Sequence, residues 1–136
     1  MIYLASPYSH EYEDVRAHRA ELAALAAAIL TKREKRFVYS PIVHGHAISA
    51  AKRLPKSWEF WRSISYDAIR KSDAIAFLLL DGWQNSVGMA TEHAWANRWR
   101  IDKTFYSLAA NRQDPRLTKI AVPPFQGLNF HAEPSH

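Results

Sequence analysis

The chain has 136 residues, of which 48% are hydrophobic, and it contains no cysteine. A chain of this length forms one domain with a proper core, and the lack of cysteine excludes disulfide bonds and thiolate metal sites. The formal charge of +5 favours contact with anions. The lysines and arginines are scattered except at 32–36, however, and this pattern does not favour nucleic acid as a partner. The N-terminus has neither the basic start nor the apolar length of a signal peptide, so we expect a cytoplasmic protein with no membrane partner.

The first half of the chain predicts a strand, a helix and a second strand. Residues 1–5 are apolar and end at Ser6-Pro7, where proline cannot continue a strand ladder. The second strand covers 36–40 and opens into a loop at 41–48. The helix between the two strands is predicted from an apolar stripe with alternating spacings of three and four: Val15, His18, Leu22, Leu25 and Ile29.

The second half centres on a buried strand. Ser57 caps a helix that runs to Ser72. The continuous apolar run Ala74–Leu80 is typical of a strand that is covered on both faces. A loop at 81–85 follows it, and Ser86 then caps a helix that runs to Arg98.

The last part of the chain is less regular. We expect a short strand at 103–106, a polar break at 109–115, a final strand near 119–122 and an irregular tail from about residue 117. The alternation of strands and helices predicts a single α/β domain over 1–136. Its expected architecture is three-layer and flavodoxin/Rossmann-like, with a mostly parallel sheet of four to five strands. In such folds, ligands bind beyond the carboxyl ends of the strands.

Three predicted loops and one helix should therefore surround a cleft. The loops are Ser6–Tyr12, Pro41–Ile48 and Asp81–Ser86, and the helix carries Glu92. The side chains expected there are a carboxylate, tyrosines, a tryptophan, two histidines and a serine at a helix start. Together they suit a planar base, a sugar and an anion. From the residues alone, Glu92 could also be an ordinary exposed helix residue, and Tyr3 could be a buried aromatic of the sheet.

Several short motifs resemble the nucleoside 2-deoxyribosyltransferase-like superfamily. They are Ile2–Tyr8 (IYLASPY), Lys71–Ala74 (KSDA), Asp81–Trp83 (DGW) and the element Ser86-x-Gly88-x-x-x-Glu92. The chain is most similar to the small bacterial members whose function is uncharacterised. The resemblance implies a protein that acts on the N-glycosidic bond of nucleosides or nucleotides.

The resemblance also implies roles for individual residues. Glu92 would be the nucleophile that attacks the anomeric carbon of the sugar. Tyr3 would donate a hydrogen bond that orients this carboxylate and keeps it ionised. Ser86 stands where members acting on unphosphorylated nucleosides often have aspartate, and a neutral hydroxyl at a helix start favours a phosphate. A plain capping serine accounts for Ser86 nearly as well, and it is compatible with both kinds of substrate. Further substrate contacts are expected from residues of the matching motifs: Ser6, Pro7, Tyr8 and Gly88.

One position departs from the family pattern. Members commonly have an aspartate that handles the proton of the base eight residues before the aspartate of the central strand, but this chain has Ser65 eight residues before Asp73. Asp67 is the nearest carboxylate, although two residues along a helix differ by about 200° in direction. Asp67 could equally pair with Arg70 or Lys71. Asp81, at the strand end, is the other candidate acid.

His44 and His46 flank a glycine and could contact substrate oxygens. Two histidines without a third ligand make a poor metal site, so we expect neither a metal nor another cofactor. Trp83 could stack on a base or plug its loop against the core.

The aromatic content suggests an assembly. Five tryptophans, six tyrosines and six phenylalanines are many for a small domain to bury. Phe125, Leu128 and Phe130 in the tail have no periodicity that places them in a helix or strand, and superfamily members are usually oligomers. We expect a homo-oligomer, a dimer or tetramer, with the tail against a partner.

Two functions remain open on the sequence. The first is cleavage or transfer at the N-glycosidic bond of a nucleoside or nucleoside 5′-monophosphate. The second is nucleotide binding without turnover on the same fold, which the serine at position 65 keeps open.

Overall fold

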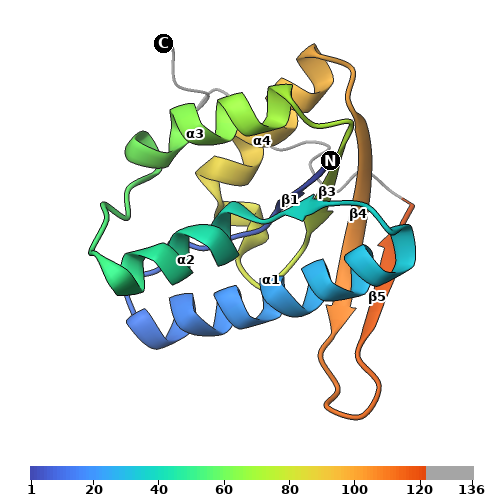
Figure 1. Ribbon diagram of the computed structural model, residues 1–136, viewed down its shortest axis with the longest axis horizontal. Helices are drawn as coiled ribbons and strands as arrows, with labels where there is room; N and C mark the ends of the chain where they lie inside the picture. Colours follow the sequence, from blue (N-terminus) through green and yellow to red (C-terminus); the bar gives the residue numbers. More distant parts are fainter. Residues whose placement is uncertain (122–136) are drawn as a thin grey trace.

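The structure is a computed structural model that describes residues 1–121 (Figure 1). The tail residues Phe125, Leu128 and Phe130 and the end of the strand predicted near 119–122 lie outside the described residues. The elements follow one another as β1 (Ile2–Ala5), α1 (Glu13–Glu34), β2 (Val38–Tyr39), α2 (Pro41–Ala51), α3 (Trp58–Arg70), β3 (Ala74–Leu78), a 3-10 turn η1 (Trp83–Asn85), α4 (Val87–Arg98), β4 (Asp102–Ala109) and β5 (Arg116–Ile120).

The five strands form one mixed sheet in the order β2-β1-β3-β4-β5. The first three pairings are parallel, with Ile2 beside Val38 and beside Ala74. β4 and β5 pair antiparallel. The α/β class is as predicted, but the prediction of a mostly parallel sheet is corrected to a mixed sheet. The connection between β4 and β5 is too short for the crossover that a parallel pairing needs, so the two strands form a hairpin.

Helices cover both faces of the sheet. Side chains alternate between the two faces along each strand, and Leu4 and Leu78 pack on the face covered by α1, beside Ala26 and Leu30. Tyr3, Ala5 and Phe77 point to the other face, where α3 and α4 supply packing partners. In Figure 1, α1 and α2 lie together in the lower half and α3 and α4 in the upper half. Burial on both faces explains the continuous apolar run in β3.

The buried side of α1 differs from the predicted stripe. Ala20, Ala23, Ala26 and Leu30 are buried, whereas His18 is exposed and the other predicted positions are half-buried. Alanines have no bulk beyond Cβ, so they lie in the middle of the contact and let the helix approach the sheet closely. The larger residues flank them. The helix was predicted correctly, but its central contact residues were not.

The segment predicted as a loop at 41–48 is helix α2. Ser40 caps this helix, since its side chain accepts a hydrogen bond from the Val43 N–H at 3.1 Å, and Pro41 occupies the first helical position. Gly45 lies inside the helix because Trp61 packs against it. A Cβ atom at position 45 would be 3.1 Å from Cη2 of the Trp61 ring.

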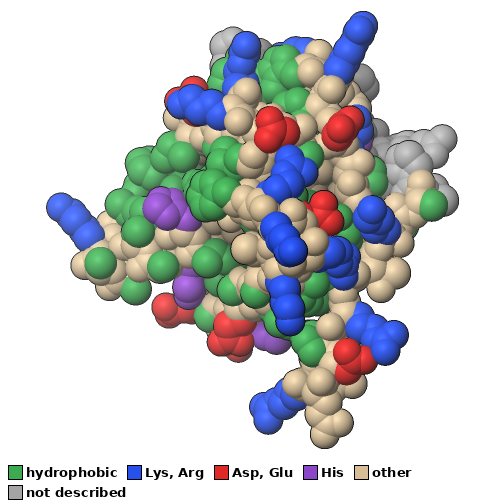
Figure 2. Space-filling model, turned by 45° about the vertical axis from the view of Figure 1, so that its right-hand side comes forward, with side chains coloured by type: hydrophobic (Ala, Val, Ile, Leu, Met, Phe, Trp, Pro, Cys, Tyr) green, Lys and Arg blue, Asp and Glu red, His purple; other side chains and the backbone are tan. Residues whose placement is uncertain are grey.

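The surface carries both charge signs. Figure 2 shows lysine and arginine side chains along the centre of one face with acidic side chains among them, and not one uninterrupted basic area. Within residues 1–121, no helix combines the length and the apolar character needed to span a membrane.

Candidate active site

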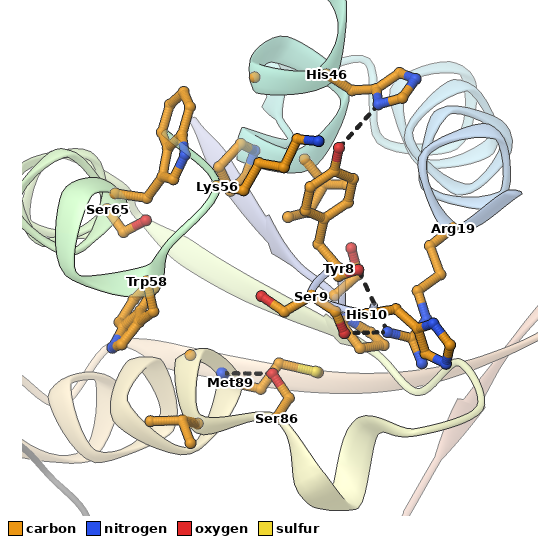
Figure 3. A pocket seen from close by; sticks show the side chains of 18 of the residues that line it. Tyr8, Ser9, His10, Arg19, His46, Lys56, Trp58, Ser65, Ser86 and Met89 are labelled. Atoms are coloured by element: carbon orange, nitrogen blue, oxygen red, sulfur yellow. Dashed lines mark hydrogen bonds between the residues drawn. The ribbon is translucent and has the colours of Figure 1, made fainter. Parts of the chain in front are cut away.

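A cavity of about 450 Å³ lies beyond the carboxyl ends of the parallel strands. Its walls come from the segments after β1 and β3, from α2 and the linker after it, and from residues of α1, α3 and α4 (Figure 3). The lining residues are Ser6, Pro7, Tyr8, Ser9, His10, Arg19, Pro41, Ile42, Gly45, His46, Ser49, Pro55, Lys56, Trp58, Trp61, Ser65, Gly82, Asn85, Ser86, Val87, Gly88, Met89 and Glu92.

Among the described lining residues, Glu92 is the one with an acidic side chain. It lies on α4 with 4% of its surface exposed, and the Tyr3 hydroxyl donates a hydrogen bond to its Oε2. Burial raises the pKa of Glu92 to about 8, and the hydrogen bond from Tyr3 lowers that pKa only in part. Burial also raises the pKa of Tyr3 well above its usual value, so the phenol is the donor of this pair. The motif resemblance implies that Tyr3 keeps Glu92 ionised, but burial raises the pKa of Glu92 more than this hydrogen bond lowers it.

The start of α4 is built by a serine and a glycine. The Ser86 hydroxyl accepts a hydrogen bond from the Met89 N–H at 3.2 Å and so caps the helix. Gly88 gives room to Trp58 of α3, because a Cβ atom at position 88 would be 3.3 Å from Cε3 of that ring. Both residues line the cavity, and each also has this packing or capping role.

Arg19 ties two of the cavity's loops together. From α1, its Nη1 donates to the Ser9 carbonyl at 2.8 Å and its Nη2 donates to the Asp81 carbonyl at 3.0 Å. The adjacent Gly82 has φ of 93°, which favours glycine. A Cβ atom there would be 2.5 Å from Arg19 Nη2. The guanidinium thus fixes the segment after β1 relative to the segment after β3.

A second link joins the segment after β1 to α2. The Tyr8 hydroxyl and Nδ1 of His46 form a hydrogen bond of 2.9 Å, and both side chains line the cavity. Ser6 is also buried against the cavity, and its hydroxyl has no hydrogen-bond partner among residues 1–121. A ligand oxygen could satisfy this hydroxyl.

The structure does not bring the two candidate acids into the cavity wall. Ser65 faces the cavity from α3, and Asp67, two residues further on, is exposed on another side of the helix. Asp81 is exposed as well, and only its backbone carbonyl takes part in the site, as an acceptor from Arg19. Neither carboxylate lines the cavity.

Two further predicted contacts also lie outside the lining. His44 is exposed on α2, where its ring is 5.8 Å from that of Tyr39. Because residues two apart on a helix point in different directions, His46 reaches the cavity and His44 does not. Trp83 packs against the core cluster of the α3 and α4 face. Among the described residues there is no group of three or more potential metal ligands.

Several lining residues were not singled out from the sequence. They include Trp58, Trp61, Arg19 and Lys56. A usable signal exists in α3, because Trp58, Trp61 and Ser65 are spaced three and four apart and so share one helix face. Arg19 has no such signal, since its partners are backbone carbonyls.

The fold and the cavity define an α/β protein with a buried carboxyl group held by a tyrosine of the central strand, beyond the carboxyl ends of the parallel strands. Residues 1–108 match the domain of unknown function DUF1937, and the chain therefore belongs to this family. No curated protein matches the chain.

Proposed function

We propose that the protein cleaves or transfers at the N-glycosidic bond of a nucleoside or nucleoside 5′-monophosphate, with Glu92 as nucleophile. The observation that carries this proposal is the buried Glu92 carboxyl in the cavity wall, hydrogen-bonded by Tyr3. The strand order β2-β1-β3-β4 is also that of a flavodoxin-like sheet, with the cavity beyond the carboxyl ends of β1 and β3. The motif resemblance to nucleoside 2-deoxyribosyltransferases points in the same direction.

The geometry suits a retaining reaction. Tyr3 holds one oxygen of Glu92, which leaves the other oxygen to attack C1′ of a sugar. The attack gives a glycosyl-enzyme ester that water, or a second base, then resolves. Because only the ionised carboxylate is a nucleophile, the rate of the first step should rise with pH toward the Glu92 pKa of about 8.

The cavity also favours an anionic group on the substrate. Arg19, Lys56 and His10 line it, and the Ser6 hydroxyl has no hydrogen-bond partner in the described part of the chain. A 5′-phosphate would match this set, with a charge-assisted contact contributing roughly 1.5–3 kcal/mol. We therefore expect 5′-monophosphates to bind tighter than the corresponding nucleosides, about tenfold to a hundredfold by calorimetry.

One observation favours the second function, nucleotide binding without turnover. Glu92 is the only carboxylate among the lining residues in the described part of the chain, and the position on α3 that faces the cavity is Ser65. A neutral base leaves an N-glycosidic bond readily only when it is protonated, so a site without an acid can bind such a nucleotide and leave it intact.

The deciding experiment is to incubate the protein with a panel of nucleosides and their 5′-monophosphates and to measure free base. Glu92→Ala should abolish release, since loss of a nucleophile costs several powers of ten. Asp67→Ala is the matched control, because it removes an exposed carboxylate outside the cavity. Activity of Glu92→Ala within about tenfold of the parent would show that the covalent mechanism is wrong.

A further inference from the structure

In the proposed reaction, the leaving base must accept the electron pair of the C1′–N bond. When the C1′–N bond of a neutral purine or pyrimidine breaks, the ring nitrogen takes both electrons and becomes an anion unless an acid protonates the base. General acids supply about a hundredfold to ten-thousandfold in such steps. An enzyme for neutral bases therefore needs a proton donor beside the base.

The described part of the cavity wall holds no second carboxylic acid for this task. Among the lining residues within 1–121, Glu92 is the only carboxylate, and the proposed reaction uses it as nucleophile. The two imidazoles of the cavity each have Nδ1 in a hydrogen bond, and both lie away from Ser65 in Figure 3. His46 is hydrogen-bonded to the Tyr8 hydroxyl, and His10 accepts the backbone N–H of Tyr12 at 3.0 Å.

Trp58 and the Arg19 guanidinium lie on opposite sides of the cavity. Trp58 and Trp61 line it from α3. Figure 3 shows Trp58 and Ser65 on one side of the cavity and His10 and Arg19 on the opposite side. Indole faces attract cations by roughly 0.5–2 kcal/mol. A substrate with a cationic ring and an anionic phosphate would place each charge against its complement.

We infer that the substrate is an N-glycosylated pyridinium, that is, a nucleoside or 5′-mononucleotide whose base is a pyridine with a positively charged ring nitrogen. This inference rests on the proposed function. It rests further on the absence of a second carboxylate from the described cavity wall and on the tryptophans on its α3 side. Such a base leaves without a proton.

The step balances without any co-reactant except water. Glu92 attacks C1′ as a carboxylate, the C1′–N bond breaks, and its electron pair neutralises the pyridinium charge. The products are a neutral pyridine and a neutral glycosyl ester. Water then adds at C1′, the sugar is released, Glu92 returns to a carboxylate, and one proton passes to solvent.

A cationic ring also suits the state of the nucleophile. Burial favours the protonated form of Glu92 in the ligand-free protein. A positive charge beside the carboxyl favours its ionised form. The substrate would therefore help to generate the nucleophile on binding, whereas a neutral base would not.

The test compares nicotinamide mononucleotide and nicotinamide riboside with adenosine and cytidine and their 5′-monophosphates. Release of free base is measured, and each rate is divided by the uncatalysed rate of the same compound. We expect the pyridinium compounds to exceed the neutral bases by about a hundredfold or more in this ratio, as expected from a missing general acid. Comparable ratios would overturn the inference and leave the proposed function standing. If no compound releases free base, both the inference and the proposed function are wrong.

A pair of variants tests the cause. Ser65→Asp places a carboxylic acid on the cavity side of α3, and Ser65→Asn adds the same bulk without an acid. We expect Ser65→Asp, but not Ser65→Asn, to raise cleavage of the neutral bases at least tenfold relative to the pyridinium compounds. Equal behaviour of the two variants would contradict the assignment. If neither variant folds, the comparison on the wild-type protein still decides.

Discussion

Replacing Glu92 by glutamine should stabilise the protein increasingly as the pH rises. The pKa of Glu92 is raised from its ordinary value of 4.5 to about 8 by burial. Between these two values the unfolded chain releases the proton and the folded chain retains it. The stability that comes from burying the neutral acid is fully present below pH 4.5 and is lost as the pH rises toward 8.

The size of the effect follows from this window. Each unit of pH inside it changes the free energy of unfolding by about 1.4 kcal/mol. Glutamine does not titrate and has nearly the shape of the protonated acid. Between pH 5 and pH 8, the stability of Glu92→Gln relative to wild type should therefore rise by roughly 3–4 kcal/mol.

Urea denaturation of both proteins at pH 5, 6, 7 and 8 measures this difference directly. Subtracting one curve from the other removes the contributions of all other titrating groups. A difference that stays constant over this range would refute the argument, because Glu92 would then titrate as it does in the unfolded chain. Under the proposed function, the stabilised variant should also be inactive.

Three further predictions concern the site's supports and the assembly. Tyr3→Phe removes the hydrogen bond that lowers the Glu92 pKa, so the rising limb of the pH–rate profile should move to higher pH, with roughly a tenfold or greater loss at pH 7; an unmoved limb would contradict the role of Tyr3. Gly82→Ala should cost about 1–2 kcal/mol in urea denaturation, because φ is 93° and the new Cβ would meet Arg19, and the cost should be smaller in an Arg19→Ala background. Equal costs in the two backgrounds would argue against the clash. Light scattering of the full chain should show a homo-oligomer of even copy number, and a version ending at Ala121 should be smaller; a monomeric full chain would end the proposal of a tail-mediated assembly.

Much of the fold could be predicted from local patterns. The caps Ser57 and Ser86 mark the starts of α3 and α4, because serine before an apolar helix satisfies free backbone N–H groups. The run after Ala74 identified the central strand. α2 was missed because Gly45 and its neighbouring histidines suggest a loop, and the reason for the glycine is a tryptophan of another helix. The mixed sheet was missed because the residues near 116–120 do not indicate whether their strand pairs parallel or antiparallel with its neighbour.

The candidate site was predictable only where the motif resemblance or loop position pointed to it. The residues of the segment after β1 and the pair formed by Tyr3 and Glu92 come together in the structure. Arg19 was missed because its role is to bond backbone carbonyls, and those are invisible in a sequence. The burial that raises the pKa of Glu92 is a property of the whole packed domain, and it cannot be predicted from the sequence around this residue.

The pairing of Tyr3 with Glu92 also bears on how the chain folds. The two residues are 89 positions apart, and they can meet only after β1 has found β3, its parallel neighbour in the middle of the sheet. Contacts between residues so far apart in the sequence form slowly. Closing the long loop between them costs conformational entropy before the stabilising contacts have formed. During synthesis, the apolar side chains of β1 therefore stay exposed until β3 has been made. In refolding experiments the helices should therefore form in an early phase and ligand binding should recover in a later one, so that the appearance of the site reports completion of the central sheet.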